Sequence, residues 1–142
     1  RIFFYSILAM RNLGEQKARQ NRMADVYISF YLKANRIHIF MDTIRSIGSP
    51  KRICFMIEEN GRTLLIAPYA QKDFKSHEVP DPVYAGSSSL EINSLRLCSL
   101  VAKLHGWDRG RSYRVSGKYS TEHNVVIFRL YEAETIERVV SS

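Results

Sequence analysis

Short runs in which polar and apolar residues alternate, or in which apolar residues follow one another, are typical of β-strands. Residues 36–39 (RIHI) alternate, and two mainly apolar strand-like runs follow, at 52–57 (RICFMI) and 62–67 (RTLLIA). The last two are joined by Glu58–Gly61 (EENG), whose Asn-Gly pair strongly favours a tight hairpin turn. The pattern therefore predicts a single strand followed by a β-hairpin.

A short helix is expected between that strand and the hairpin. Met41, Ile44 and Ile47 recur at three-residue spacing and would share one helical face. Gly48 is placed to end the helix, and Pro50 blocks its continuation. The first half of the chain thus has the order strand, helix, hairpin.

The second half of the chain begins in the same way. A strand-like run at 89–92 (SLEI) precedes a longer helix, which Asn93 or Ser94 would cap and Gly106 would end. The apolar stripe of this helix contains Leu95, Leu97, Cys98, Leu100, Val101, Ala102 and Leu104. Trp107, directly after the helix, is expected to anchor the turn against the core.

Two further strand runs complete the second half, at 112–119 (SYRVSGKY) and 125–130 (VVIFRL). We interpret the chain as two repeat units, about 36–68 and 89–130, joined by a proline-containing linker at 68–88. A unit of this size is too small to enclose a core alone, whereas two units can share one.

The fold class predicted from this pattern is β-rich α+β. Its architecture would be a pseudo-twofold barrel of duplicated strand–helix–hairpin units, which leaves few exposed strand edges. The additional run Val26–Leu32 (VYISFYL) is expected to form an edge strand. An α+β sandwich without a repeat is the alternative.

Residues 1–22 differ from the rest and are interpreted as a leader or N-terminal extension, which could add a strand or helix. Residues 23–142 are then a single globular domain, as the length of 142 residues allows. The leader opens with the apolar run 2–10 (IFFYSILAM), which is too short to span a bilayer, where about 20 apolar residues are needed. No membrane role is therefore predicted.

The overall charge points weakly toward an acidic partner such as nucleic acid. The chain has 21 Lys and Arg against 14 Asp and Glu, a net charge of +7. Residues 1–22 hold five of these cations and one acid, so more than half of the excess lies in the leader. The remaining domain is nearly balanced, and the case for nucleic acid depends on where its arginines lie.

A family resemblance rests on three segments of the first unit. Arg36–Ile39, the Thr43–Arg45 stretch with Gly48 after it, and the hairpin ending at Pro68 resemble the swapped-hairpin repeat of the AbrB, SpoVT and MraZ family. These are bacterial transcription factors and antitoxins, and MraZ-like members carry two repeats in one chain. The second unit here matches by its order of elements alone. The resemblance implies a barrel that binds DNA through basic side chains on one face.

Basic residues follow the predicted helix in both units. Arg114, Ser116 and Lys118 alternate with apolar neighbours, which would place a cationic face on that strand. The candidate nucleic-acid-binding residues are Arg45, Lys51, Arg52, Arg109, Arg111, Arg114 and Lys118. Such residues would contact phosphates, with sequence preference arising from a few arginines on base edges.

Aromatic residues cluster in two strand-like regions, and base stacking is one reading of them. Aromatic residues in strands are more often core or cross-strand partners, so we interpret them as packing residues. The set comprises Tyr27, Phe30, Tyr31, Tyr113, Tyr119 and Phe128.

Catalytic chemistry has little support in the sequence. The four histidines fall in different elements, without Cys or carboxylates at metal-ligand spacing. Cys54 and Cys98 are expected to be buried thiols, consistent with a cytoplasmic protein. Glycines form no phosphate-binding loop ahead of a helix. We therefore predict no catalytic residues, no metal and no cofactor.

The sequence is compatible with two functions. The leading hypothesis is a non-catalytic DNA-binding protein, a transcription regulator whose partner is double-stranded DNA; a homodimer is left open. The alternative is a protein-binding module. It would be an antitoxin-like partner, or an inhibitor of a larger nucleic-acid enzyme such as a phage or mobile element encodes.

Overall fold

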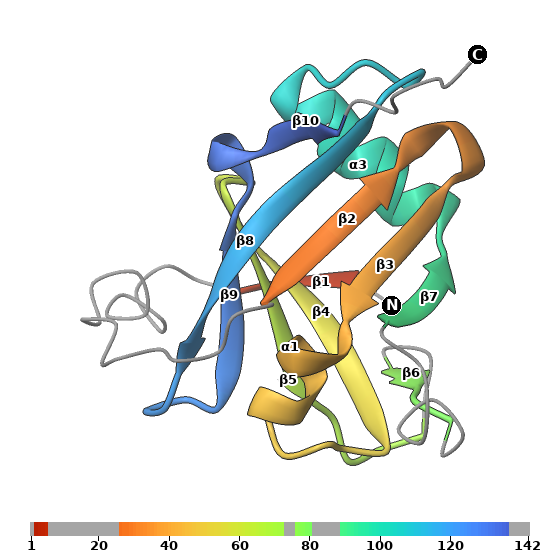
Figure 1. The fold of residues 1–142 in the computed structure, drawn as a ribbon. Helices are drawn as coiled ribbons and strands as arrows, with labels where there is room; N and C mark the ends of the chain where they lie inside the picture. Colours follow the sequence, from red (N-terminus) through yellow and green to blue (C-terminus); the bar gives the residue numbers. More distant parts are fainter. Residues whose placement is uncertain (1, 6–25, 73–75, 81–88, 137–142) are drawn as a thin grey trace.

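Strands dominate the computed structural model of this chain, which describes residues 2–5, 26–72, 76–80 and 89–136 (Figure 1). The strands are β1 (Ile2–Tyr5), β2 (Tyr27–Tyr31), β3 (Arg36–Phe40), β4 (Arg52–Glu58), β5 (Thr63–Pro68), β6 (Ser76–Glu78), β7 (Ser89–Asn93), β8 (Ser112–Ser120), β9 (Val125–Arg129) and β10 (Glu134–Ile136). Two α-helices, α1 (Met41–Ser46) and α3 (Leu95–His105), and two short 3-10 turns, η1 (Leu32–Ala34) and η2 (Leu130–Glu132), lie between them.

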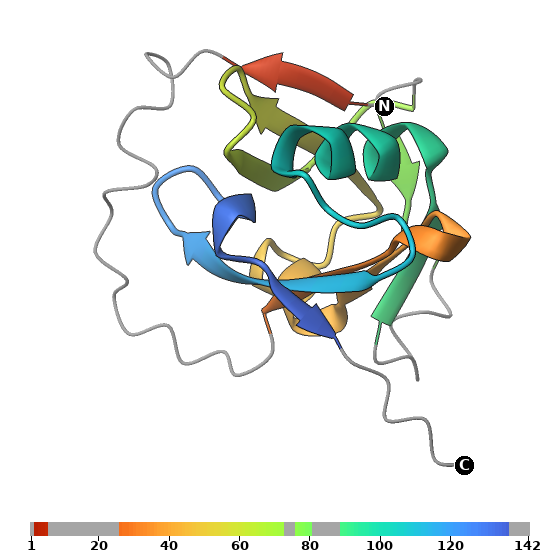
Figure 2. The same cartoon turned by 90° about the horizontal axis from the view of Figure 1, so that it is seen from above.

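The strands form one curled sheet in the order β1-β4-β5-β9-β8-β2-β3-β7. In addition, β6 pairs with β4, and β10 pairs with β8. All pairs are antiparallel except β1 with β4, which is parallel. Seen from above, the sheet curves around the core, against which α3 packs (Figure 2). The result is a curled half-barrel, so the β-rich part of the predicted fold class is confirmed.

Strand β8 joins two parts of this sheet, because it changes partners along its length. Residues 112–116 pair with β2, whereas residues 117–120 pair with β9. Gly117 lies at the changeover, and a Cβ there would lie 2.6 Å from Cε1 of Phe128 and 2.8 Å from Cγ1 of Val126. The lack of a side chain at this position therefore lets β9 pass closely over β8.

The main core lies on the concave side of the sheet. Its largest fully buried side chains include Phe30, Phe55 and Phe128, from β2, β4 and β9. Both helices contribute to this core, α1 through Met41 and Ile44, and α3 through a buried stripe. That stripe comprises Leu97, Cys98, Val101 and Ala102. A smaller apolar cluster of Cys54, Leu65, Ala67, Val125 and Ile127 lies on β4, β5 and β9.

The ends of the second helix agree with the local sequence signals. The hydroxyl of Ser94 accepts a hydrogen bond from the backbone N–H of Leu97 at 3.1 Å, which caps the helix. Gly106 ends it in the left-handed conformation, with φ 64°. Leu95 and Leu104, expected on the apolar stripe, are instead 62% and 47% exposed, because the buried side of the helix is the narrower set Leu97, Cys98, Val101 and Ala102.

The run Val26–Leu32, expected as an edge strand, differs from the prediction, because β2 lies between β3 and β8 and is paired on both sides. Within the expected linker at 68–88, β6 pairs with residues 52–54 of β4. Within the leader, β1 pairs with β4, and an added strand was one of the two possibilities expected there. The pairings of β2 with β8, of β6 with β4 and of β1 with β4 join segments distant in the chain, so local patterns could not reveal them.

Candidate nucleic-acid interface

The seven basic residues chosen from the sequence fall in three places. Arg114 and Lys118 lie on β8, and Arg109 and Arg111 precede that strand. The remaining three are Arg45 on α1, Lys51 just before β4, and Arg52 at its first position. In the sheet order β4 is separated from β8 by β5 and β9, so the two units do not contribute neighbouring strands to one basic surface.

Strand β8 carries its basic residues on the face that points away from the core. Tyr113 and Val115 are buried in the core, whereas Ser116 and Lys118 are exposed and Arg114 is half-buried. The alternation expected for this strand is therefore present over residues 113–118. We call the convex side of β8, β2 and β3 the outer sheet face. Its residues are Tyr27, Ser29, Tyr31, Arg36, His38, Phe40, Ser112, Arg114, Ser116 and Lys118.

Arg114 sits among aromatic rings at the middle of the outer sheet face. Its guanidinium carbon lies 5.6 Å from the ring centroid of Tyr27 and 5.4 Å from that of Phe40. The two rings are themselves 5.6 Å apart and tilted by 60°. Nε of Arg114 also reaches Oγ of Ser29 at 3.5 Å, the outer limit of a hydrogen bond. The arginine is thus held by cation–π contacts with two strands.

A second ring pair lies farther along the same two strands. Tyr31 meets His38 edge-on, with ring centroids 4.7 Å apart. Nε2 of His38 lies 3.0 Å from Oε1 of Glu91, but the orientation falls outside hydrogen-bond geometry, so this buried nitrogen has no bonded partner. Between the two ring pairs lies Ser29, which is fully buried under its longer neighbours.

Charged residues lie on particular strands in the cross-strand row that contains Arg114. The register places Glu134 of β10 opposite Arg114, Arg114 opposite Ser29, and His38 opposite Glu91 of β7. In this row the acids Glu134 and Glu91 lie on the outermost strands, and Arg114 lies between them on β8. We call Arg114 and Lys118, which share the outer side of β8, the cationic strip.

Arg109 and Arg111 are engaged near the start of β8. Arg109 donates a hydrogen bond through Nη2 to Oδ1 of Asn35, and Nε of Arg111 lies 3.7 Å from Oδ2 of Asp108. Both arginines are exposed, so these contacts contribute little to stability. They extend the cationic strip at one end without joining the aromatic rings.

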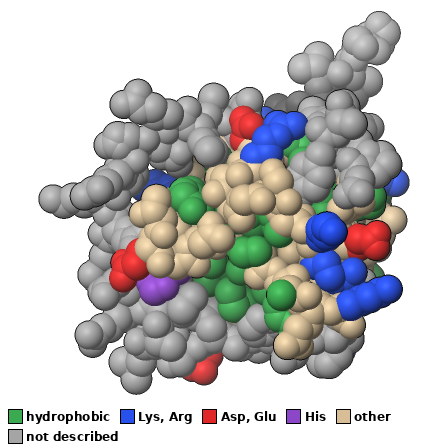
Figure 3. Space-filling model, turned by 90° about the horizontal axis from the view of Figure 1, so that it is seen from below, with side chains coloured by type: hydrophobic (Ala, Val, Ile, Leu, Met, Phe, Trp, Pro, Cys, Tyr) green, Lys and Arg blue, Asp and Glu red, His purple; other side chains and the backbone are tan. Residues whose placement is uncertain are grey.

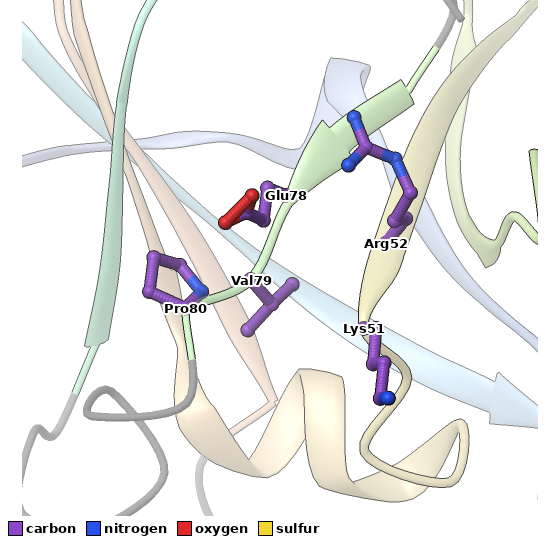
Figure 4. A pocket seen from close by; sticks show the side chains of 5 residues that line it. All are labelled: Lys51, Arg52, Glu78, Val79 and Pro80. Carbon is purple, nitrogen blue, oxygen red and sulfur yellow. The ribbon is translucent and has the colours of Figure 1, made fainter. Parts of the chain in front are cut away.

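Lys51 and Arg52 line a separate open cavity of about 290 Å³, with Glu78, Val79 and Pro80 on its other wall (Figure 4). Arg52 donates through Nε to Oγ of Ser76 at 2.7 Å, which directs its guanidinium toward β6. The presence of Glu78 weakens the positive potential of this cavity. It is therefore the poorer anion site of the two.

Seen from below, the molecule shows lysine and arginine side chains gathered along one side of the view, next to acidic side chains (Figure 3). Arg45, on the exposed side of α1, pairs with Asp42 at 3.3 Å. The basic residues of the first unit are thus accompanied by acids at short distance.

The aromatic residues fall into the two expected packing groups. Phe30, Tyr113 and Phe128 are core residues, whereas Tyr27 and Tyr31 are cross-strand partners on the outer sheet face, where they contact Phe40 and His38 of β3. Alternation along the strand could have shown which face these two residues occupy. Tyr27 and Tyr31 lie on the same side as Ser29, and the apolar Ile28 and Phe30 lie on the other side.

Both cysteines are buried, and neither is poised for reaction. Burial raises the pKa of the Cys98 thiol from about 9 to about 11, although the Arg109 guanidinium opposes the rise. This thiol is therefore protonated at neutral pH and a poor nucleophile. In the part of the chain that the structure describes, no three His, Cys, Asp or Glu residues come together as metal ligands.

Nor do the described residues include a helix long and apolar enough to cross a membrane. Comparison with protein-family models, curated proteins and solved structures found no match to this chain. The outer sheet face is therefore the feature of the molecule that bears most on its function.

Proposed function

We propose that this chain is a non-catalytic DNA-binding protein that acts in the regulation of transcription. The observation that carries the proposal is the cationic strip on the outer sheet face. There Arg114 and Lys118 follow one another on one side of β8, with the hydroxyl of Ser116 between them. Lysine, arginine and serine side chains are the groups that proteins use most often to contact DNA phosphates.

The arrangement of elements gives a second line of support. Each half of the chain has the order strand, helix, hairpin, as β3-α1-β4-β5 and as β7-α3-β8-β9. The first strands of the two halves pair with one another, and so do the last strands, β5 and β9. Two related copies about a pseudo-twofold axis would produce these pairings. This favours the duplicated, MraZ-like barrel that the sequence suggested.

Fluorescence anisotropy with the full chain and a short labelled DNA duplex tests the proposal. Binding should weaken steeply between about 50 and 200 mM salt, with a log–log slope of about −0.9 for each phosphate contacted. The double variant Arg114→Glu, Lys118→Glu should lose most of this affinity. A double variant at exposed positions elsewhere, Arg62→Glu with Lys103→Glu, makes the same change in net charge and should lose much less.

The absence of any duplex binding by the wild-type chain at low salt would refute the proposal. Equal losses in the two double variants would show that only net charge matters, and would remove the outer sheet face from it.

A second candidate function, a protein-binding module, is favoured by one observation. Two large apolar side chains, Leu104 and Tyr131, are 47% and 48% exposed. Leu104 lies against Gly61, and the Arg62 guanidinium lies 4.4 Å from the Tyr131 ring centroid, so both flank the β4–β5 turn. A partner that binds the wild type but not the variant Leu104→Glu, Tyr131→Ser would establish this function.

A further inference from the structure

The outer sheet face carries more aromatic surface than a solvent-facing sheet requires. An antiparallel sheet with one buried face normally places polar residues on the other. Here the rings of Tyr27, Tyr31, His38 and Phe40 lie on the convex side of β2 and β3, and all four are half-buried. The core on the concave side is filled by residues of the opposite parity, such as Ile28 and Ile39. The outer rings are therefore not needed to complete the core.

From this placement we infer that the outer sheet face binds single-stranded nucleic acid, with unpaired bases stacked on its two ring pairs. The inference rests on that part of the proposed function that assigns nucleic-acid binding to this face, and it specifies a single strand as the form bound more tightly than a duplex. Bases stack on aromatic side chains whatever their sequence, because every base has a π-face. Arginine guanidinium planes offer a further stacking surface, and Arg114 already lies against both Tyr27 and Phe40.

The spacing of the ring pairs favours a single strand over a duplex. One pair contains Tyr27 and the other Tyr31, which are four residues apart on one strand. At about 3.3 Å per residue, the two pairs are about 13 Å apart. Successive bases in a duplex are separated by about 3.4 Å and are covered by their neighbours in the stack. Only a strand with splayed bases can place one base on each ring pair.

The charges around the rings suit a nucleic-acid backbone. Lys118 is exposed beyond the Tyr27 end of the face. Arg36 is exposed at the Tyr31 end, where its Nε lies 4.0 Å from Oε2 of Glu91, which offsets part of its charge. The flanking acids, Glu91 on β7 and Glu134 on β10, would repel phosphates from the rims. The favourable path therefore follows the cations of β8 beside the rings of β2 and β3, the strands that lie side by side at the front of Figure 1.

The composition of the face separates this occupant from a protein partner. Among the described residues of β8, β2 and β3, the outer sheet face holds rings, cations and serines and no aliphatic side chain. Protein interfaces typically have an apolar core from which charged residues are depleted. Here Arg114 lies at the centre of the aromatic surface, which matches aromatic residues interleaved with cations in single-strand binding sites.

The test compares three probes by fluorescence anisotropy with the full chain at one salt concentration. The probes are a labelled mixed-sequence single strand, the same strand in a duplex, and an abasic strand of equal length. We expect the single strand to bind at least about 10-fold more tightly than the other two probes, because only it offers accessible bases. The abasic strand retains every phosphate, so it isolates the contribution of stacking.

Matched variants locate the binding to the rings. Phe40→Leu should weaken single-strand binding by about 5- to 150-fold, the equivalent of one lost base stack, with less than about a twofold change for the duplex. Phe40→Tyr retains a ring and should retain binding, which controls for misfolding. Tyr131→Leu removes an exposed ring that also contacts an arginine but lies on η2, outside the outer sheet face, and should have no effect.

Each outcome is decisive. Equal binding of the single strand, the duplex and the abasic strand would overturn the inference while leaving DNA binding intact. Equal losses in Phe40→Leu and Tyr131→Leu, or the same loss in Phe40→Tyr, would also overturn it. Binding of the single strand with no binding of the duplex would support the inference and refute the proposed duplex-binding function. If none of the three probes binds, both fail.

Discussion

The two faces of the β8–β2–β3 sheet both carry aromatic rings but differ in what surrounds them. On the concave face, Phe30 and Ile28 are completely buried among aliphatic side chains. On the convex face, Tyr27 and Phe40 are half-buried, and their nearest charged neighbour is Arg114. An aromatic ring stabilises the fold in the first setting and remains available to a ligand in the second. Parity along the strand decides between them, because a one-residue shift moves every side chain to the other face.

The largest expected contrast is in stability. Phe30→Ala should lower the free energy of unfolding by about 3–5 kcal/mol, since it leaves a cavity in the core beside Trp107. Phe40→Ala, on the outer sheet face, should cost about 1 kcal/mol, because the ring is already partly solvated and loses one cation–π contact. Urea denaturation of both variants measures the difference. Equal costs would mean that the outer rings are structural.

The next contrast concerns Gly117, at the point where β8 changes its pairing from β2 to β9. Gly117→Val should destabilise the protein by about 1–3 kcal/mol, because the new side chain would overlap Phe128 and Val126. Gly110→Ala is the control, since a Cβ at Gly110 would meet only the exposed carboxylate of Asp108, with Oδ1 at 3.3 Å. Thermal unfolding of the two variants tests this. A stable Gly117→Val protein would contradict the close approach of β8 and β9.

A smaller change in the free energy of unfolding is expected at alkaline pH, and it comes from Cys98 in the core. The pKa of Cys98 is raised by burial from about 9 to about 11, so between these values the unfolded thiol ionises while the folded thiol stays protonated. Unfolding then releases a proton, and the free energy of unfolding should fall by up to about 1.4 kcal/mol per pH unit. Below pH 9 this contribution is fully present. Cys98→Ala should show a shallower decline in denaturant midpoint over the same range.

The smallest expected change in stability is at the exposed end of the outer sheet face. Lys118→Ala should alter the free energy of unfolding by less than about 0.5 kcal/mol, because the side chain is exposed. It should nevertheless reduce the slope of log affinity against log salt by about 0.9, the value for one phosphate contact. An unchanged slope in DNA-binding titrations would place Lys118 outside the interface.

Much of the local structure could be predicted because its signals lie within a few residues of one another. The hairpin at Glu58–Gly61, the helix between Ser94 and Gly106, and the cationic side of β8 all depend on short-range sequence. Capping hydroxyls, glycines that adopt positive φ and alternation along a strand act locally, so the sequence displays them directly.

Only the tertiary structure decided which strands became neighbours. The strand at Tyr27–Tyr31 was expected at an edge, yet it lies between β3 and β8, and this placement brings Arg114 onto Tyr27 and Phe40. Arg114 and Ser29, which face each other in that register, are 85 residues apart in the chain. Such pairing follows from burying all of the concave faces in one shared core, a global condition that no local pattern contains. The sequence by itself determined the elements and the parity of their faces; the packing of the core determined that two rings and an arginine would meet on the outside.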